Sequence, residues 1–525
     1  MALSGAVIAR PKPARAQAIG GRGTAASKTL RIIHGSNLQS RDPIWTTAPP
    51  TKDYAFLVFD QLLAVDDKYV PRPQMAEGWT IEDDGRTYAF TLREGLTFHD
   101  GEPVRSQDCI PSIRRWGARD GFGQALMKVV DTMEAVDDRR FKIRLTRPFP
   151  LLPNAIGKSS SSQCFIMPER MATTDPMKQV TESIGSGPYR FLADEFVSGA
   201  HAAWARFDKY VPRKEPVSGI AGGRIAAVDR LEWAIISDAA TAMAALMAGE
   251  KDYWDSPTND LIPVMASDPN IVVDARNTSG SYSMLQFNHT QPPFNNPAIR
   301  QALAMAVDQA QFLKSATSDP ALMKPCYGFY ACDTAYASED GADVLKVKSI
   351  AKAKQALAAA GYNGEKVVIL GLDSGSSGPM AQVLDDLLRK LGVNVQLVAV
   401  DFATLAQRRV SKEPVDKGGW SLFVTGWTGT DILDPAVNQL LRGGGAKGWF
   451  GWADDPALED LRDRWFAAAD ADERARLANE VQLQAFKTLP YLPLGSTINK
   501  VAYRKNLTGV FPSPVAAYWN IGKKA

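Results

Sequence analysis

Residues 92–104 read LREGLTFHDGEPV, and this stretch says the most about how the chain folds. Directly before it, residues 88–92 alternate in character as the side chains of a half-buried strand do. Asp100 and Gly101 form a dipeptide typical of a tight turn, and Pro103 followed by Ser106 predicts the start of a helix. The local pattern therefore predicts a strand, a turn and a helix in succession, and it assigns no chemistry to the segment.

Other motifs of comparable length occur in a fixed order along the chain. They read MAEGW at residues 75–79, IGSGPYRF at 184–191, AALMAGEKD at 244–252 and PFNNPAIRQAL at 293–303. Together with residues 92–104, this series resembles the signature of the extracellular solute-binding proteins of ABC importers. The resemblance is to the large family that serves dipeptides, oligopeptides, nickel chelates and some sugars, and it runs from about residue 30 to the C-terminus.

The resemblance implies an α/β, bilobed periplasmic-binding-protein fold of the large, class C type. Its two lobes are joined by a hinge, and the first lobe carries an extra subdomain. On this pattern the chain crosses between lobes near residues 286–293, where Asn and Pro cluster after a strand-like run, and returns near residues 495–501. The expected parts are lobe I at residues 28–62, 184–287 and 498–525, the extra subdomain at 63–183, and lobe II at 288–497.

The second half of the chain also carries a pattern that can be read without the resemblance. Residues 349–360 predict a helix that Ser349 caps and Gly361 ends. Residues 367–370 predict a buried strand, 380–391 a helix, and 393–400 another strand, which together make a βαβ unit with a parallel sheet. Residues 457–488 predict a pair of long amphipathic helices.

Length, composition and charge narrow the class of protein. The 525 residues exceed what one hydrophobic core usually serves, so we expect two or three packed units. With 45% hydrophobic and 22% charged residues the chain has an ordinary globular composition. The formal net charge of +2 implies no basic patch, so nucleic acid is not an expected partner. No apolar run of about 18 residues occurs after the N-terminal region, so no membrane span is expected there.

Residues 1–18 differ in kind from the rest of the chain. A small, apolar stretch precedes Arg10, and Ala16-Gln17-Ala18 has the small-x-small form of a signal-peptidase site. We interpret this segment as the remnant of an export signal, with a disordered arm as the alternative. The first cysteine is Cys109, so a lipid anchor is not supported, and we expect an exported, periplasmic protein without one.

The four cysteines allow one short loop. Cys326 and Cys332 are close enough in sequence to pair in an exported protein, and two free thiols are the alternative. No CxxC pair or nearby histidine completes a metal-ligand set. Cys109 falls early in a helix pattern, where a small buried apolar side chain is expected.

Patterns that suggest catalysis lack the context that catalysis needs. Residues 443–448 read GGGAKG and match G-x-G-x-x-G, but no helix pattern comes after them, so we expect a flexible loop. Residues 374–378 read SGSSG, which is no nucleophile elbow and at most a helix N-terminus that receives an anion. The four histidines are scattered, and His99 is expected to orient a turn. We therefore predict no enzyme, with no catalytic residue, cofactor or metal site, because the nucleophile or metal set of a secreted hydrolase is not found.

The candidate ligand site lies at residues 425–435, which read TGWTGTDILDP. Val424 ends an apolar run, so these polar residues come at the C-terminal end of a strand, where open α/β sheets bind ligands. In peptide-binding members of the family, a similar Gly-Trp stretch supplies backbone contacts and an Asp that pairs with the peptide's α-ammonium. Asp431 is the nearest match, although it lies four residues after Trp427 where those members have three. The alternative is a surface turn in which Asp431 or Asp434 caps a helix.

The opposite wall of the cleft is expected from two other segments. The full set of predicted ligand-binding residues is Asn37, Trp45, Thr46, Thr47, Ser279, Ser281, Tyr282, Gly426, Trp427, Thr428 and Asp431. The aromatic members would form apolar walls and the amides and hydroxyls would set orientation, although Trp45 and Tyr282 equally suit a core. Dipeptide receptors hold the C-terminal carboxylate with an Arg in the loop that corresponds to residues 373–379, and this chain has none there.

The expected function is that of the periplasmic substrate-binding component of an ABC importer. It would capture a small organic solute, a short peptide or peptide-like compound first, by closing its two lobes without covalent chemistry. The expected partners are that ligand and an ABC permease with its ATPase at the inner membrane, and the protein is expected to be a monomer. The alternatives are a non-peptide solute, such as an oligosaccharide, an opine-like conjugate or a metal chelate, and a protein that presents its ligand to a chemoreceptor.

Overall fold

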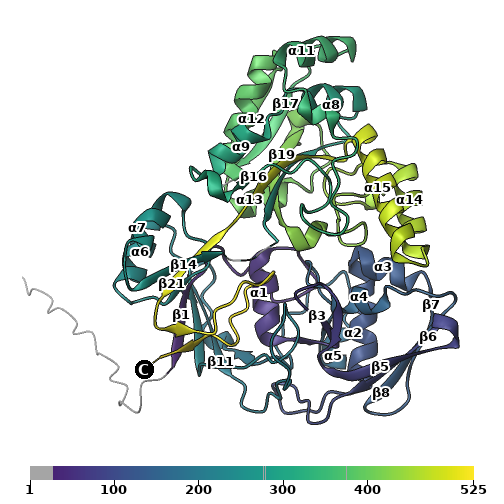
Figure 1. Cartoon of the computed structure of the whole chain (residues 1–525), viewed down its shortest axis with the longest axis vertical. Coiled ribbons are helices and arrows are strands. Elements are labelled where there is room, and N and C mark those ends of the chain that lie inside the picture. Colours follow the sequence, from purple (N-terminus) through teal and green to yellow (C-terminus); the bar gives the residue numbers. More distant parts are fainter. Residues whose placement is uncertain (1–27, 276, 278, 374, 376, 525) are drawn as a thin grey trace, which may run out of the picture.

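The computed structural model describes residues 28–275, 277, 279–373, 375 and 377–524. The predicted export signal, Ser374 and Ser376 therefore lie outside the described residues. Figure 1 shows a narrow upper body above a broad lower part, whose two halves each contain their own sheet. None of the described helices combines the length and the apolar character that a membrane crossing needs.

Residues 88–108 fold as predicted, within a four-stranded antiparallel sheet of order β5-β6-β8-β7. Strand β6 ends at Leu92, Gly101 turns the chain with a φ of 94°, and helix α2 begins at Ser106. We call residues 63–183 the four-stranded unit. Its main elements are β5 (Ala76–Glu82), β6 (Thr87–Leu92), β7 (Val130–Ala135), β8 (Arg140–Leu145), α2 (Ser106–Arg119), α3 (Gly121–Met127), α4 (Leu152–Gly157) and α5 (Glu169–Ala172).

His99 fastens this segment to the glycine-rich stretch at residues 184–191. The backbone N–H of His99 donates to the Gly185 carbonyl at 2.8 Å, and its Nε2 lies 3.0 Å from the Gly187 carbonyl oxygen. Burial lowers the pKa of His99 to about 4, so the ring is neutral near pH 7. A Cβ at Gly185 would lie 2.0 Å from the Val58 carbonyl oxygen, so the close approach of these chains requires glycine.

The left half of the lower part is built on a seven-stranded sheet of order β10-β11-β12-β1-β13-β21-β14 (Figure 1). Its central strand β1 is parallel to β12 and β13 and is buried along most of its length. We call residues 28–62, 184–275 and 500–524 the seven-stranded body. Its main elements are β1 (Thr29–Ile33), β10 (Tyr189–Phe191), β11 (His201–Arg206), β12 (Arg230–Ala234), β13 (Tyr253–Trp254), β14 (Ile271–Ala275), β21 (Lys500–Arg504), α1 (Pro49–Val58), α6 (Ala239–Met247) and α7 (Ile262–Ala266).

The upper body is built on a six-stranded sheet of order β16-β20-β15-β19-β17-β18 (Figure 1). Strand β17 is parallel to β18, with α12 between them in sequence, so the predicted βαβ unit is confirmed. Ser349 caps α11 by accepting from the Lys352 N–H, as predicted. We call residues 281–497 the six-stranded body. Its strands are β15 (Ser281–Phe287), β16 (Met323–Lys324), β17 (Val367–Leu372), β18 (Val395–Val400), β19 (Leu422–Thr428) and β20 (Tyr491–Thr497).

Helices cover this second sheet, and the predicted pair at residues 457–488 is confirmed as α14 and α15. The glycine-rich residues 443–448 form a loop containing one short 3-10 turn, as expected. The helices are α8 (Pro297–Ala304), α9 (Gln309–Ala316), α10 (Asp343–Lys346), α11 (Ile350–Ala359), α12 (Ser377–Leu391), α13 (Phe402–Arg408), α14 (Pro456–Ala467) and α15 (Ala471–Thr488). Small two-stranded sheets pair β2 (Asp60–Gln61) with β9 (Phe165–Ile166), β3 (Leu63–Val65) with β4 (Pro71–Pro73), and β22 (Leu507–Thr508) with β23 (Gly522–Lys523).

The first passage between the two large sheets comes one strand earlier than predicted. Strand β15 pairs with β19 and β20 along most of its length, so it belongs to the six-stranded sheet. The placement of the crossing at residues 286–293 was therefore wrong, because the Asn and Pro cluster marks the end of a strand and not a change of sheet. The return passage lies between Thr497, where β20 ends, and Lys500, where β21 begins.

The four-stranded unit packs against the six-stranded body as well as against the seven-stranded body. Phe466 on α14 lies 5.7 Å from Phe122 and 6.0 Å from Phe149 between ring centroids. All three side chains are buried within one continuous apolar cluster that spans both parts. On the other side, Arg115 of the four-stranded unit pairs with Asp42 of the seven-stranded body at 2.7 Å. The unit thus bridges the two bodies.

Candidate ligand-binding site

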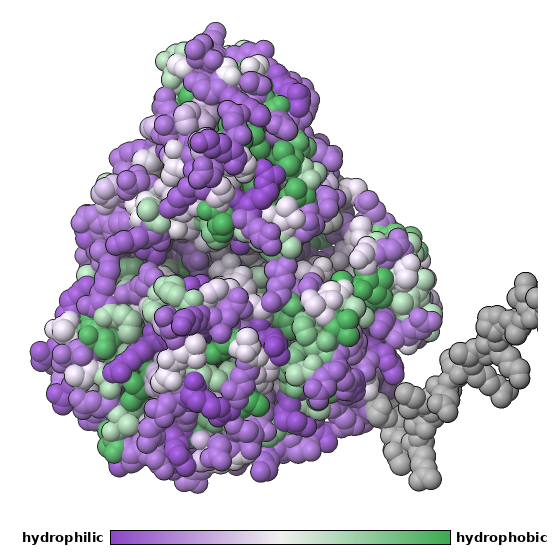
Figure 2. All heavy atoms as spheres, turned by 180° about the vertical axis from the view of Figure 1, so that it is seen from behind, coloured by the Kyte–Doolittle hydropathy of each residue, from purple (hydrophilic) through white to green (hydrophobic). Residues whose placement is uncertain are grey.

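A cavity of about 210 Å³ lies where the two bodies and the four-stranded unit meet. Its lining comes from the start of α1 and the preceding loop, from the end of β19, from the two passages between the sheets, and from single residues elsewhere. The lining residues are Thr47, Ala48, Pro49, Lys52, Asp53, Ser161, Asn277, Ser281, Phe402, Arg409, Thr425, Gly426, Trp427, Thr428, Asp431, Trp449, Asn499, Pro514 and Val515. Figure 2 shows the rear face, where a paler, recessed band separates the upper body from the broad lower part.

The end of β19, which the sequence predicts to bind the ligand, lines this cavity. The strand is buried up to Val424, and Thr425 and Gly426 then become accessible. Trp427 is only 7% exposed, and none of the described residues accepts a hydrogen bond from its indole Nε1. Its ring packs edge-on against Trp449 at 5.4 Å, so the two indoles form an apolar wall.

The edge of β19 beside the cavity is open. Strand β17 pairs with β19 only at Leu422 and Phe423, whereas β15 pairs with it all the way to Thr428. Among the strands that the structure describes, none continues the pairing past Phe423 on the β17 side. Apart from the Thr428 N–H, which Asp431 binds, the main-chain groups of residues 424–428 that point to that edge are therefore available.

Asp431 occupies the role of a helix cap, which was the alternative to an ammonium anchor. Its Oδ2 accepts from the backbone N–H and the hydroxyl of Thr428, at 3.3 and 2.5 Å, at the start of the 3-10 turn Gly429–Ile432. Its Oδ1 accepts from the backbone N–H of Ser161 at 2.6 Å. The side chain is 3% exposed, so this carboxylate ties the six-stranded body to the four-stranded unit while it lines the cavity.

The predicted site residues divide into two groups. The cavity brings together Thr47, Ser281, Gly426, Trp427, Thr428 and Asp431, and it does not include Asn37, Trp45, Thr46, Ser279 or Tyr282. The Tyr282 hydroxyl is buried and accepts from the Cys332 N–H at 2.8 Å, so this ring belongs to the core. The Trp45 ring lies under the Arg119 guanidinium at 4.8 Å, and the Asn37 amide bonds to Ser198 and Gly199.

Two cationic residues that line the cavity, Lys52 and Arg409, were not among the predicted ligand-binding residues. Lys52 lies on α1 and is 6% exposed, and Arg409 comes directly after α13 with its guanidinium carbon 4.5 Å from the Phe450 ring centroid. Burial lowers the pKa of Arg409 to about 10. The resemblance to dipeptide receptors implies a carboxylate-binding Arg at residues 373–379, whereas Arg409 lies in a polar segment with no motif that would single it out.

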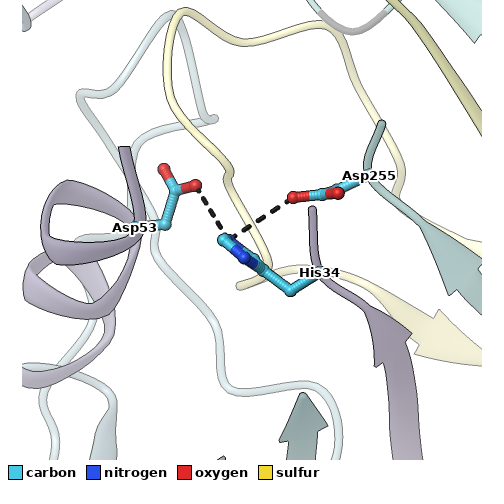
Figure 3. A group of neighbouring side chains, drawn as sticks. All are labelled: His34, Asp53 and Asp255. Carbon is cyan, nitrogen blue, oxygen red and sulfur yellow. Dashed lines mark hydrogen bonds and ion pairs between the residues drawn. The ribbon is translucent and has the colours of Figure 1, made fainter. Parts of the chain in front are cut away.

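A buried charged cluster adjoins the cavity through Asp53, and Figure 3 shows its three side chains. His34, directly after β1, directs its Nε2 between Asp53 on α1 and Asp255 after β13, at 3.4 Å from an Oδ2 of each. Its Nδ1–H donates to the Ser36 carbonyl at 2.8 Å, and its ring stacks on Trp233. Burial acts to lower the pKa of His34, but the charge of Asp255 and the contacts with Asp53 outweigh burial, and the net pKa is raised.

This cluster is the only described set of three His, Cys, Asp or Glu side chains whose potential ligand atoms all lie within 4.8 Å. Asp255 also accepts from the Gly35 N–H at 2.9 Å, and Asp53 from the Ala516 N–H at 3.3 Å. With these contacts, the His34, Asp53 and Asp255 side chains form an ion-pair cluster that joins β1, α1 and β13. Since Asp53 also lines the cavity, the cluster fixes one of its walls.

A second hollow of about 490 Å³ borders the return passage at Asn499 and Lys500. It is lined by residues 256–260 and 314–318, with Gly375, Pro379, Asn499 and Lys500, and Asn499 also lines the first cavity. Gly375 and Pro379, from the segment in which an Arg would be expected by resemblance to dipeptide receptors, thus line this second hollow and not the first cavity. Cys326 and Cys332 form a disulfide in the six-stranded body, while Cys109 and Cys164 are free and buried.

Comparison with known proteins decides the family. Residues 70–449 match the model of the bacterial extracellular solute-binding proteins, family 5 middle region. The chain belongs to this family. A relative from Sinorhizobium fredii, named a probable peptide ABC transporter periplasmic-binding protein, is 38% identical over 524 residues, which cover 99% of this chain and 97% of the relative.

Solved structures of periplasmic binding proteins share this fold. AgaA of Agrobacterium tumefaciens in complex with agropinic acid matches with a TM-score of 0.79 at 22% identity, over 95% of this chain and 99% of that one. A dipeptide-binding protein of Pseudoalteromonas with bound Met-Leu matches with a TM-score of 0.76 at 19% identity, over 95% and 100%. The protein thus has the bilobed periplasmic-binding-protein fold and is a non-enzymatic solute-binding component of an ABC importer.

Proposed function

We propose that this solute-binding protein captures a short peptide or peptide-like compound between its two bodies and delivers it to the membrane permease. The seven-stranded body, with the four-stranded unit, acts as lobe I, and the six-stranded body acts as lobe II. Asn277, Ser279 and Gly280 in one passage and residues 498–499 in the other belong to the hinge. The eleven predicted ligand-binding residues reduce to the six that line the cavity, joined by Lys52, Arg409 and Trp449.

The observation that carries this proposal is the open edge of β19 at the cavity. An extended peptide can add to an unpaired strand edge, because its amides and carbonyls match the spacing of the strand beside it. Residues 424–428 lack a partner on the β17 side among the described strands, and Trp427 and Trp449 stand beside them as walls for side chains. The cavity of about 210 Å³ is below the 300–1,000 Å³ of typical ligand pockets, which favours a short peptide over a long one.

A thermal-shift panel on ligand-stripped protein tests the proposal. The panel contains di- to tetrapeptides, single amino acids, oligosaccharides, opine-like conjugates and histidine-chelated nickel. A ligand at a hundred times its dissociation constant should stabilise the protein by about 2.7 kcal/mol. We expect peptides or peptide-like compounds to raise the melting temperature, and a response to sugars or chelates alone would contradict the proposal.

Peptides with N-methylated backbone amides are the matched control for edge pairing. N-methylation keeps the charges and side chains of a peptide and removes the N–H that a strand edge would bind. We expect the shift to be lost with the methylated forms. An undiminished shift would mean that the peptide does not pair with β19.

The same proposal places the protein in the periplasm as a free monomer. The matched family is that of extracellular solute-binding proteins, and Ala16-Gln17-Ala18 suits a signal-peptidase site. Fractionation of expressing cells and sizing of the released protein test this. Retention in the membrane fraction would indicate an anchor, and a larger particle would indicate an oligomer.

A further inference from the structure

We propose that the solute carries a carboxylate or equivalent anionic group, and that Lys52 from lobe I and Arg409 from lobe II hold it together with the Trp427 indole N–H. This inference rests on the proposed function, because it assumes that the cavity between the lobes is the solute site.

Arg409 is only partly buried, and it differs from the fully buried arginines in having no acceptor among the described residues. Arg115 pairs with Asp42, Arg224 with Asp60 and Arg462 with Glu459, at 2.7, 2.8 and 3.0 Å, and Arg300 donates to the carbonyl oxygens of Phe294 and Thr488. In the part of the chain that the structure describes, the Arg409 guanidinium has only the ring faces of Trp449 and Phe450, and its buried Nε lacks a hydrogen-bond acceptor. Leaving the buried Nε of a partly buried cation without an acceptor costs free energy, so such a site points to an anion that this cavity receives.

Lys52, which lines the cavity from lobe I, also lacks an ion-pair partner among the described residues. The comparably buried Lys158 pairs with Asp120 at 2.5 Å, whereas Lys52 forms no ion pair with any carboxylate in the described ranges. The two carboxylates that line the cavity are committed elsewhere. Asp431 accepts from Thr428 and Ser161, and Asp53 contacts His34 and accepts from Ala516.

The cavity therefore gathers donors that lack acceptors. Arg409, Lys52 and Trp427 all line it. In the part of the chain that the structure describes, the Arg409 Nε and the Trp427 Nε1 lack an acceptor and Lys52 forms no ion pair. A carboxylate supplies two oxygens with about four lone-pair directions and can receive two N–H groups of one guanidinium. A neutral group would leave at least one cation unpaired.

The arrangement also links the charge of the solute to closure. Lys52 and Arg409 come from different lobes, so closing the lobes brings two like charges to one cavity. An anion between them removes that repulsion and contacts both lobes, so it favours the closed form over the open one. Neutral solutes of the same shape lack this differential contact and are rejected.

Free-acid and C-terminally amidated forms of the same dipeptides test the inference by titration calorimetry. The two forms share side chains and ammonium groups and differ only in the anionic end. Because hydrogen bonds to charged groups are the strong ones, we expect the acid to bind about 10- to 100-fold more tightly than the amide. In the Arg409→Gln variant this preference should fall by at least about tenfold. The Arg408→Gln variant is the control and should keep the preference, because Arg408 does not line the cavity.

The possible outcomes separate the two claims. Equal binding of acid and amide overturns the inference and leaves the proposed function intact. If no di- to tetrapeptide and no peptide-like compound binds in either form, the proposed function fails and the inference falls with it. A purely structural role of Arg409 can be tested on the ligand-free protein. In that case Arg409→Gln would lower the melting temperature as strongly as Arg462→Gln, which breaks a buried ion pair. We expect only Arg462→Gln to do so.

Discussion

At the residue scale, the imidazole of His34 links protonation to stability. Its folded-state pKa is raised by Asp255 and Asp53 above the value of 6.5 that it has when unfolded. The stabilisation from the charged ring is therefore fully present below pH 6.5 and is lost as the pH rises through the raised pKa. We expect the free energy of unfolding to fall over that window, and chemical denaturation at a series of pH values measures it.

The His34→Gln variant should be less stable at low pH and should lack this pH dependence. Dialysis against a chelator is the second control, because the same three side chains could hold a cation. An unchanged melting temperature after dialysis is the expected result. A fall on dialysis would show that a bound ion, and not the protonated ring, neutralises the two carboxylates.

Asp431 yields a separate prediction. Its replacement by Ala removes the acceptor of the Ser161 N–H and of Thr428, which leaves buried donors unpaired. We expect a loss of about 1–3 kcal/mol of stability in urea unfolding. Asp454→Ala, at an exposed position, is the matched control and should be neutral. A stable Asp431→Ala protein that no longer binds peptide would instead revive the ammonium-anchor interpretation.

Some residues of the candidate site could be predicted from the sequence and others could not. The strand-end rule located Gly426, Trp427 and Thr428 at the cavity, because the change from apolar to polar side chains is a local signal. Lys52 and Arg409 have no such signal. Their importance lies in the absence of partners, and only the packed structure shows which of many charged side chains lack one.

At the element scale, the disulfide between Cys326 and Cys332 constrains the segment before α10. It closes a loop across a sequence separation of 6, and the Cys332 N–H donates to Tyr282 on β15. A loop of this size should contribute about 2 kcal/mol by limiting the unfolded chain. We expect the Cys326→Ser/Cys332→Ser protein to melt lower than the wild type, and reduction to lower only the wild type. Equal effects of the reductant on both proteins would contradict this assignment.

The elements themselves were largely predictable, and their partners were not. The helix capped by Ser349 and the parallel pair of β17 and β18 are explained by local periodicity and cap chemistry. The sheet to which β15 belongs is not, because residues 281–287 make an apolar strand that suits either sheet. Its pairing with β19 and β20 is decided by contacts with residues about 140 to 210 positions away.

At the scale of the whole molecule, the four-stranded unit bears on closure. Phe466 of lobe II packs on Phe122 and Phe149 of that unit, and Lys128 pairs with Asp463 at the edge of the same contact. These contacts join the lobes on one side of the cavity. They should stabilise the closed form independently of the solute.

The Phe466→Ala variant tests this role. Because truncation of a buried phenylalanine removes about 3–5 kcal/mol of packing, we expect a larger radius of gyration without ligand and weaker solute binding. Phe486→Ala is the control, since Phe486 packs on Phe329 within lobe II. It should lose stability without a change of shape in X-ray scattering. Expansion in both variants would mean that Phe466 has no special part in closure.

The most direct measurement is a crystal structure of the protein with its tightest-binding dipeptide. The account predicts that the peptide backbone lies along residues 424–428 of β19, with its carboxylate between Lys52 and Arg409 and beside the Trp427 indole. A peptide bound in the second hollow near residues 256–260, or one whose carboxylate contacts neither cation, would contradict it.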